Sequence, residues 1–154
     1  MVSRLAPDAN NPQAPAHEKN ILAFGEVLWD RLPNAMILGG APMNFAYRAA
    51  SLGDRAAIIS RLGDDDLGRE ASALLSELGV DRSLVQMDAV HPTGVVDIEF
   101  DDDMAAHIHV RPNAAFDNIE PLAGALRYSQ TGFASFCPLM HHYLKPFCED
   151  NRAV

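Results

Sequence analysis

Residues 39–46 read Gly39-Gly40-Ala41-Pro42-Met43-Asn44-Phe45-Ala46, an order that indicates a sharp turn leading directly into a helix. Two adjacent glycines let the backbone turn tightly and approach a ligand closely. Pro42 presets φ for a first helical turn, whose N–H groups still lack partners. The turn is therefore a predicted site for polar oxygens. The Asn44 side chain would add a donor and an acceptor there, as a hydroxyl group requires.

Apolar segments lie on both sides of this turn. Residues 21–28 form a short continuous apolar run, which is typical of a strand covered on both faces. The helix after Pro42 is predicted to end at Gly53, and residues 55–63 predict a second strand. Together these elements predict an α/β arrangement.

Asp30 follows the first predicted strand. Open α/β sheets bind ligands beyond the carboxyl ends of their strands, so an acidic side chain here is a candidate ligand group. A solvated turn carboxylate is the alternative that the residues alone leave open. In the same way, two glycines and a proline before a helix are often only a loop and a cap.

The spacing of several glycines around Asn44 resembles the first motif of the ribokinase-like (PfkB-type) carbohydrate kinases. The matching residues are Gly39, Gly40, Asn44, Gly53 and Gly63. The resemblance extends from about residue 20 to about residue 121 and is greatest to fructokinase-like members. It implies an α/β fold, namely a ribokinase-like three-layer sheet with helices on both faces plus a small β-sheet lid, incomplete at the C-terminus of this chain.

The resemblance also implies a sugar site. In the family, an Asp at the position of Asp30 accepts hydrogen bonds from two sugar hydroxyls. Gly39, Gly40 and Asn44 are the other expected sugar-binding residues of the first motif. The substrate expected from the resemblance is a fructose-like ketose or a related carbohydrate.

The lid is expected in a predicted hairpin, where segments 93–100 and 105–111 flank the polar turn 101–104. In fructokinase-like and ketodeoxygluconate-kinase-like relatives, an Arg at the end of this lid strand reaches the substrate. Arg111 is therefore a candidate, and His109, two residues earlier on the same face, is a weaker one. A surface arginine at a hairpin end is the alternative. Some lids of the family also pair two subunits, so a homodimer through the lid is a further expectation.

Composition and resemblance divide the chain of 154 residues into three parts. Residues 1–19 contain Pro7, Pro12 and Pro15 without a hydrophobic period, and we expect a disordered tail. Residues 20–136 are expected to form the N-terminal part of the ribokinase-like domain, with lid strands at about 29–38 and 93–112. Residues 137–154 fit no family pattern, and a natural truncation, a frameshift and a cropped gene model all stay open for this tail.

Several weaker elements complete the secondary structure predicted from the sequence. They are strands at 83–87 and 132–137 and helices at 69–78 and 116–126. The family also has a Gly-x-Asp-x-x-Gly arrangement that matches Gly63, Asp65 and Gly68, and its expected role is structural.

No metal site is predicted. The acidic run 64–66 is explained by a helix N-cap and by the positive end of the helix, and residues 101–103 are interpreted as a solvated loop tip. His107 and His109 share a strand face but lack a third ligand, and the set His141, His142 and Cys148 lacks a fourth.

Bulk properties exclude some classes of function. A net charge of -9 and a pI near 4.9 argue against a nucleic-acid partner, because neutralising phosphates requires clustered Lys and Arg. Two cysteines provide no disulfide framework, which favours a cytoplasmic protein. No apolar run is long enough for a membrane span, and no leader pattern opens the chain.

The complete kinases of the family use ATP and Mg²⁺, with a catalytic Asp in a later Gly-Ala-Gly-Asp motif. That motif does not occur in this sequence. We therefore expect the chain alone to hold no catalytic base, to bind neither ATP nor Mg²⁺, and to lack kinase activity. Half a doubly wound sheet would also leave open strand edges, which predicts association. A catalytically inactive sugar-binding or dimerisation module and a non-functional truncation are the alternatives.

Overall fold

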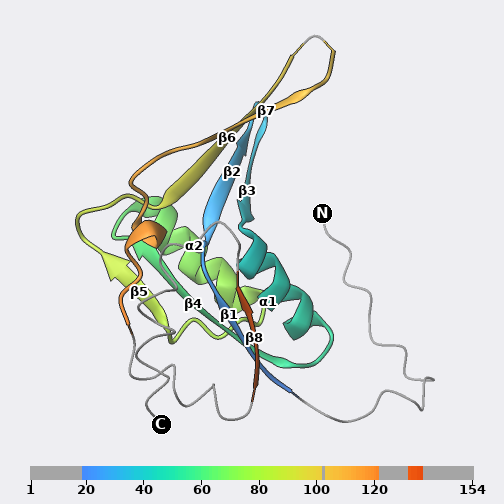
Figure 1. Ribbon diagram of the computed structural model, residues 1–154, viewed down its shortest axis with the longest axis vertical. Coiled ribbons are helices and arrows are strands. Elements are labelled where there is room, and N and C mark those ends of the chain that lie inside the picture. Colours follow the sequence, from blue (N-terminus) through green and yellow to red (C-terminus); the bar gives the residue numbers. More distant parts are fainter. Residues whose placement is uncertain (1–18, 102, 122–131, 137–154) are drawn as a thin grey trace, which may run out of the picture.

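The computed structural model describes residues 19–101, 103–121 and 132–136, and these contain two sheets and two α-helices (Figure 1). In chain order the elements are β1 (Asn20–Phe24), β2 (Leu28–Leu32), β3 (Ala35–Gly39), α1 (Ala41–Ser51), β4 (Arg55–Gly63), α2 (Asp66–Glu77), β5 (Val85–Asp88), β6 (Gly94–Phe100), β7 (Ala106–Val110), the 3₁₀ helix η1 (Ala115–Asn118) and β8 (Gly132–Phe136).

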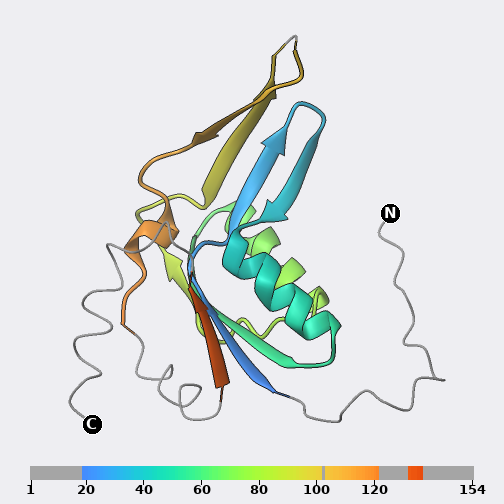
Figure 2. The same cartoon turned by 45° about the vertical axis from the view of Figure 1, so that its right-hand side comes forward.

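The first sheet is parallel and has the strand order β5-β4-β1-β8. The second sheet, here named the lid sheet, has the order β3-β2-β6-β7, in which only the β2–β6 pair is parallel. The two hairpins of the lid sheet project away from the parallel sheet (Figures 1 and 2). The expected α/β fold with a small lid sheet is confirmed.

Both described helices pack on the same face of the parallel sheet. Ile21 and Ala23 of β1 and Ile58 of β4 point to this face and form one buried cluster with α1 and α2. Alternate residues of the same strands, such as Phe24 and Ile59, point to the other face. Helices were expected on both faces, and within the described ranges the second face is contacted by the short 3₁₀ helix η1 and by the partly buried side chains of Leu84 and Ile119.

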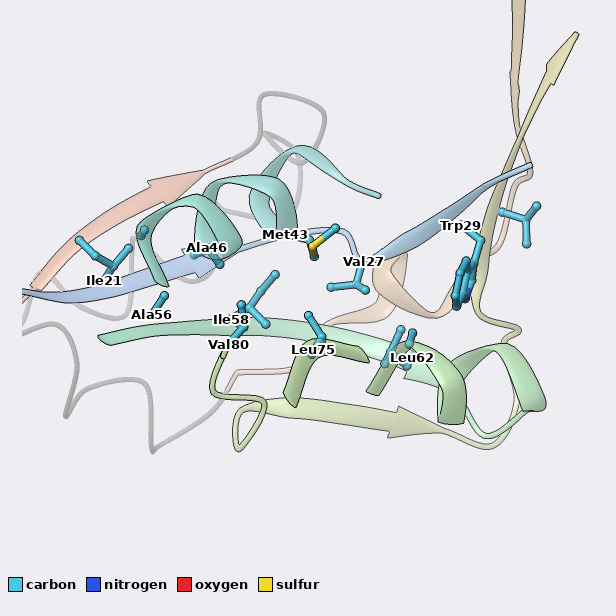
Figure 3. Close-up of a cluster of buried hydrophobic side chains, with 14 residues drawn as sticks. Ile21, Val27, Trp29, Met43, Ala46, Ala56, Ile58, Leu62, Leu75 and Val80 are labelled. Atoms are coloured by element: carbon cyan, nitrogen blue, oxygen red, sulfur yellow. The ribbon is translucent and has the colours of Figure 1, made fainter. Parts of the chain in front are cut away.

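The core runs from the parallel sheet to the base of the lid sheet. Met43 and Ala46 of α1 face β4, where Ile58 lies, and Leu75 of α2 packs beside them (Figure 3). Trp29 of β2 is 3% exposed, and its Nε1–H donates a hydrogen bond to the carbonyl oxygen of Leu67 at 3.0 Å. This buried indole ties the lid sheet to the start of α2.

Three predicted elements differ from the observed ones in their bounds or in their type. The first strand ends at Phe24 because Gly25 has φ 138° and leaves the sheet, although the apolar run continues to Leu28. Helix α2 begins at Asp66, earlier than expected, because Asp65 serves as its N-cap. The helix expected at 116–126 is a 3₁₀ helix where it is described, and residues 122–131 lie outside the described part. The segments 1–18 and 137–154 lie outside it as well.

A network of hydrogen bonds joins the start of α2 to the residue that precedes the lid strand β6. Asp65 Oδ1 accepts from the Gly68 N–H at 2.7 Å and from the Thr93 hydroxyl at 2.7 Å, and Oδ2 accepts from the Thr93 N–H at 2.8 Å. The Thr93 hydroxyl in turn accepts from the Gly63 N–H at 3.0 Å. Gly68 packs so closely on Gly63 that a Cβ there would overlap the Gly63 carbonyl. These contacts support a structural role for the Gly-x-Asp-x-x-Gly arrangement.

Replacing Asp65 with alanine is expected to lower the free energy of unfolding by about 2–4 kcal/mol at pH 7, since it removes three hydrogen bonds and a helix cap. Partial burial raises the pKa of Asp65, but hydrogen bonds from Thr93 and Gly68 outweigh it and hold the pKa below its usual value. The carboxylate's stabilisation is therefore complete at neutral pH and is lost as the pH falls below the ordinary Asp range. Urea titrations at pH 7 and in acid measure both effects.

Asp66→Ala is the matched control, because the neighbouring Asp66 side chain is 99% exposed. An equal loss in both variants, or a difference that persists in acid, would contradict the assigned role of Asp65.

Candidate sugar site

The turn between β3 and α1 has the geometry that two glycines permit. β3 ends at Gly39, α1 begins at Ala41, and Gly40 between them has φ +108°, a region that L side chains rarely adopt. A Cβ on Gly40 would overlap the carbonyl oxygen of Glu26 and lie 3.2 Å from its Cγ. Both the conformation and the lack of space therefore require glycine at position 40.

Asp30 lies inside β2, within the range of about 29–38 expected for a lid strand, and not directly after the first strand, which ends at Phe24. It pairs with Ile37 of β3 and Val96 of β6, and Val96 pairs with Val110 of β7. Because laterally paired residues share a face, the carboxylate belongs to a row of apolar side chains across the lid sheet. This placement explains why the side chain is half-buried and why burial raises the pKa of Asp30.

The Asp30 carboxylate contacts the Gly39 backbone directly. A Cβ built on Gly39 would overlap Oδ2 of Asp30 and lie 3.0 Å from its Cγ. Within the part of the chain that the structure describes, no hydrogen bond or ion pair to this carboxylate is found. A partly desolvated carboxylate without a protein partner retains its lone pairs for the hydroxyl groups of a ligand.

Asn44 lies one helical turn from Gly40. Its backbone N–H donates to the Gly40 carbonyl at 2.9 Å, and its side chain is exposed. Met43 and Ala46 are 2% and 0% exposed, so their packing fixes the rotation of α1 about its axis. Asn44 is left on the solvent-exposed side of the helix. The predicted turn thus brings Gly39 into direct contact with Asp30, whereas Gly40 lies against Glu26, and Asn44 lies one turn further along α1.

Arg111 lies on the other face of the lid sheet. Its Nε–H donates to Asp97 Oδ2 at 3.0 Å, and Asp97 also forms an ion pair with Arg31. The hydrogen bond from Arg111, followed by that from Arg31, outweighs burial and holds the pKa of Asp97 below its usual value. Asp97 pairs with Arg31 and His109, whereas Asp30 pairs with the adjacent Val96. The sugar-binding role of Arg111 stays a prediction, and it would require the side chain to leave Asp97.

Sequence reasoning missed Glu26. This residue is only 4% exposed, and its Oε1 accepts a hydrogen bond from the Ala41 N–H at 3.1 Å. The available signal was an isolated acidic residue within the apolar run 21–28, because such a residue requires a partner when it is buried.

Two surface hollows found in the described part of the chain lie elsewhere. One is lined by Ser76 and residues 79–83, and the other by Asn20, residues 55–57, Gly79 and Asp81, at the start of the parallel strands. Neither contains Asp30 or Asn44. The described residues also include no group of three or more His, Cys, Asp or Glu side chains placed to hold a metal ion, and no helix among them is long and apolar enough to cross a membrane.

Comparison with known proteins agrees with the fold. The family described as pfkB family carbohydrate kinase matches residues 18–131. The chain belongs to this carbohydrate kinase family. Fructokinase-1 from Oryza sativa subsp. japonica is 38% identical over 81 residues, which are 45% of this chain and 25% of the rice protein.

Solved structures of this kinase family share the fold. Fructokinase from Vibrio cholerae in apo form has 28% sequence identity and a TM-score of 0.59, covering 63% of this chain and 36% of that one. Fructokinase with bound ATP from Xylella fastidiosa has 30% identity and a TM-score of 0.58, covering 66% and 33%. The chain thus spans about a quarter to a third of the length of these relatives.

Proposed function

We propose that this pfkB-family chain forms the sugar-holding part of an ATP-dependent kinase for a fructose-like ketose or a related sugar. The observation that carries the proposal is the Asp30 carboxylate, which is half-buried, lacks a described protein partner and lies against Gly39. The fructokinase relatives support the choice of fructose as the first sugar to test.

Each residue of the proposed site has a distinct task. Asp30 accepts hydrogen bonds from two sugar hydroxyls, and its partial burial strengthens these bonds. Gly39 and Gly40 permit close approach of the backbone to the sugar. Asn44 offers both a donor and an acceptor to a further hydroxyl.

The phosphoryl donor in this proposal is ATP, which is present in the Xylella fastidiosa relative. Phosphoryl transfer requires Mg²⁺ and a base for the sugar hydroxyl. The described residues do not fit that requirement, because they include no metal-binding group of three ligands and the sequence has no Gly-Ala-Gly-Asp motif. We therefore propose that the chain alone binds sugar without phosphorylating it. We also propose that it functions in the cytoplasm.

Calorimetric titration of the chain with D-fructose, D-ribose and D-mannitol tests the proposed function. Binding of at least one of these polyols, together with no ADP release above background when ATP and Mg²⁺ are added, is the expected result. If none of the three polyols binds, the sugar-holding role is contradicted. ADP release that depends on one of them would contradict the absence of catalysis.

A second candidate function, a dimerisation module, is favoured by the apolar face of the lid sheet. Ile37, Phe100, Ile108 and Val110 are 52%, 45%, 63% and 57% exposed, and strand alternation puts them on the same face as Asp30. We propose that a second copy of this chain covers the face, because four large apolar side chains lie exposed on one face of the same sheet.

Ile108→Glu is expected to convert such a dimer to a monomer, because it would bury a charge at the contact. Sedimentation velocity at several protein concentrations measures the change. Val90→Glu is the matched control, since Val90 is 82% exposed but lies outside the lid sheet. A monomeric wild-type chain, or equal dissociation by both variants, would count against the lid dimer.

A further inference from the structure

The Gly39–Gly40 turn is held by an acidic side chain that the proposed sugar contacts leave unused. Glu26 lies between β1 and β2, directly after Gly25, whose N–H donates to the Ile59 carbonyl at 3.1 Å. Here the chain leaves the parallel sheet and enters the lid sheet. The Glu26 side chain is buried at this junction, with 4% of the residue exposed.

Glu26 caps α1 from a distant part of the sequence. Its Oε1 accepts from the Ala41 N–H at 3.1 Å, fifteen positions later in the chain. Helix α1 has no side-chain cap of its own at Gly40 and no acidic residue in its first turn. A side-chain oxygen at the N-terminus of a helix satisfies an N–H group that has no partner within the helix. Glu26 therefore replaces the local cap that α1 lacks.

One acidic residue lies against each glycine of the turn. Gly39 contacts Asp30, and Gly40 contacts the Glu26 carbonyl and Cγ. The two acidic residues are four positions apart, with Glu26 in the segment that connects the sheets and Asp30 in β2, so the Glu26 contact adds to the β2–β3 pairing in fixing the turn relative to Asp30. The other carboxylate oxygen, Oε2, is buried and has no hydrogen-bond partner among the described residues. Only Oε1 is thus used to hold the turn.

We propose that Glu26 is a positioning residue of the sugar site: it holds the Gly40–Ala41 peptide through Oε1 and thereby fixes the turn against Asp30, without touching the sugar. This inference rests on the proposed sugar-holding function. It predicts that the hydrogen-bond acceptor matters and that the charge does not. Glutamine at position 26 keeps an acceptor of the same reach, whereas alanine removes it.

The test compares Glu26→Ala, Glu26→Gln and the wild-type chain by two measurements. Exchange of the Ala41 amide hydrogen, followed by NMR without sugar, reports on the turn itself. Calorimetry with D-fructose reports on the site. In Glu26→Ala, we expect about tenfold faster exchange at Ala41 and about tenfold weaker fructose binding, whereas Glu26→Gln stays within about threefold of wild type in both. Glu70→Ala, an exposed acidic residue of α2, is the control and should change neither quantity.

Unchanged Ala41 exchange or unchanged fructose affinity in Glu26→Ala would overturn the proposal, and so would a Gln variant as impaired as the Ala variant. If Glu26→Ala does not fold, Glu26→Gln decides, because loss of protection or of affinity in it contradicts a role based on Oε1 alone. A wild-type chain that binds no sugar would refute the proposed function. The exchange data would still show whether Glu26 holds the turn.

Discussion

Asp30→Asn is expected to weaken fructose binding by about 30-fold or more while leaving the chain folded. Two hydrogen bonds from sugar hydroxyls to a carboxylate would be lost or weakened, and each charge-assisted bond contributes about 1.5–3 kcal/mol. The loss would come from the site itself, because no described residue depends on the Asp30 side chain for a hydrogen bond. Calorimetry of the variant and the wild type, at one pH above neutrality, measures the ratio of dissociation constants.

The substitution Asp30→Asn should weaken fructose binding without lowering the stability of the fold. Burial raises the pKa of Asp30 in the folded chain, so the folded state binds the proton more tightly than the unfolded state does. The stability contribution of this group is therefore greatest at low pH and declines as the pH rises from the ordinary Asp range through the raised pKa. Asp30→Asn removes this cost, and its free energy of unfolding at pH 7 should equal or exceed that of the wild type.

Asp103→Asn is the matched control for both measurements, because Asp103 is exposed in the loop between β6 and β7. The assignment of Asp30 would be wrong if Asp30→Asn bound fructose like this control. It would also be wrong if the loss of affinity followed a general loss of folded protein.

Gly40→Ala is expected to cause the largest loss of stability, about 3–4 kcal/mol. A Cβ at position 40 would combine a left-handed φ of +108° with overlap of the Glu26 carbonyl, and backbone on both sides would have to shift. Gly53→Ala isolates the first of these effects. Gly53 has φ +97° but no atom within 4 Å of a built Cβ, so only conformational strain of about 1–2 kcal/mol is expected there.

Equilibrium denaturation of the two alanine variants measures the difference. Equal destabilisation would mean that the turn at Gly40 tolerates a side chain, and the close packing of Glu26 on the turn would then be incorrect. A folded Gly40→Ala chain should also bind fructose more weakly than Gly53→Ala does.

The sequence was sufficient for elements whose ends carry their own chemical signals. β4 was predicted with its observed bounds, because an apolar segment lies between two glycines. Pro42 marked the start of α1, and an acidic N-cap was expected among residues 64–66, where Asp65 is found. These signals act over a few residues, so they can be read without knowing the fold.

Other features depend on pairing between distant segments. The apolar run 21–28 passes from the parallel sheet to the lid sheet at Gly25, and hydrophobic period alone does not reveal a change of sheet. Asp30 was therefore placed directly after the first strand, whereas β1 ends at Phe24 and Asp30 lies inside the lid strand β2. Similarly, the face on which Arg111 lies is determined by the register between β6 and β7, in which His109 pairs with Asp97. Glu26 required knowledge that position 41, fifteen residues later, would return to it.

The turn at Gly39 and Gly40 and the side chains of Asp30 and Asn44 are proposed to hold a sugar. Titration of the ¹⁵N-labelled chain with D-fructose, observed residue by residue in the backbone amide spectrum, tests it most directly. We predict saturable shifts at Gly39, Gly40 and Asn44, none at Gly53, and loss of these shifts in Asp30→Asn at the fructose concentration that half-saturates the wild-type chain. Shifts confined to the hollow around Gly79, or persisting in Asp30→Asn, would contradict this assignment.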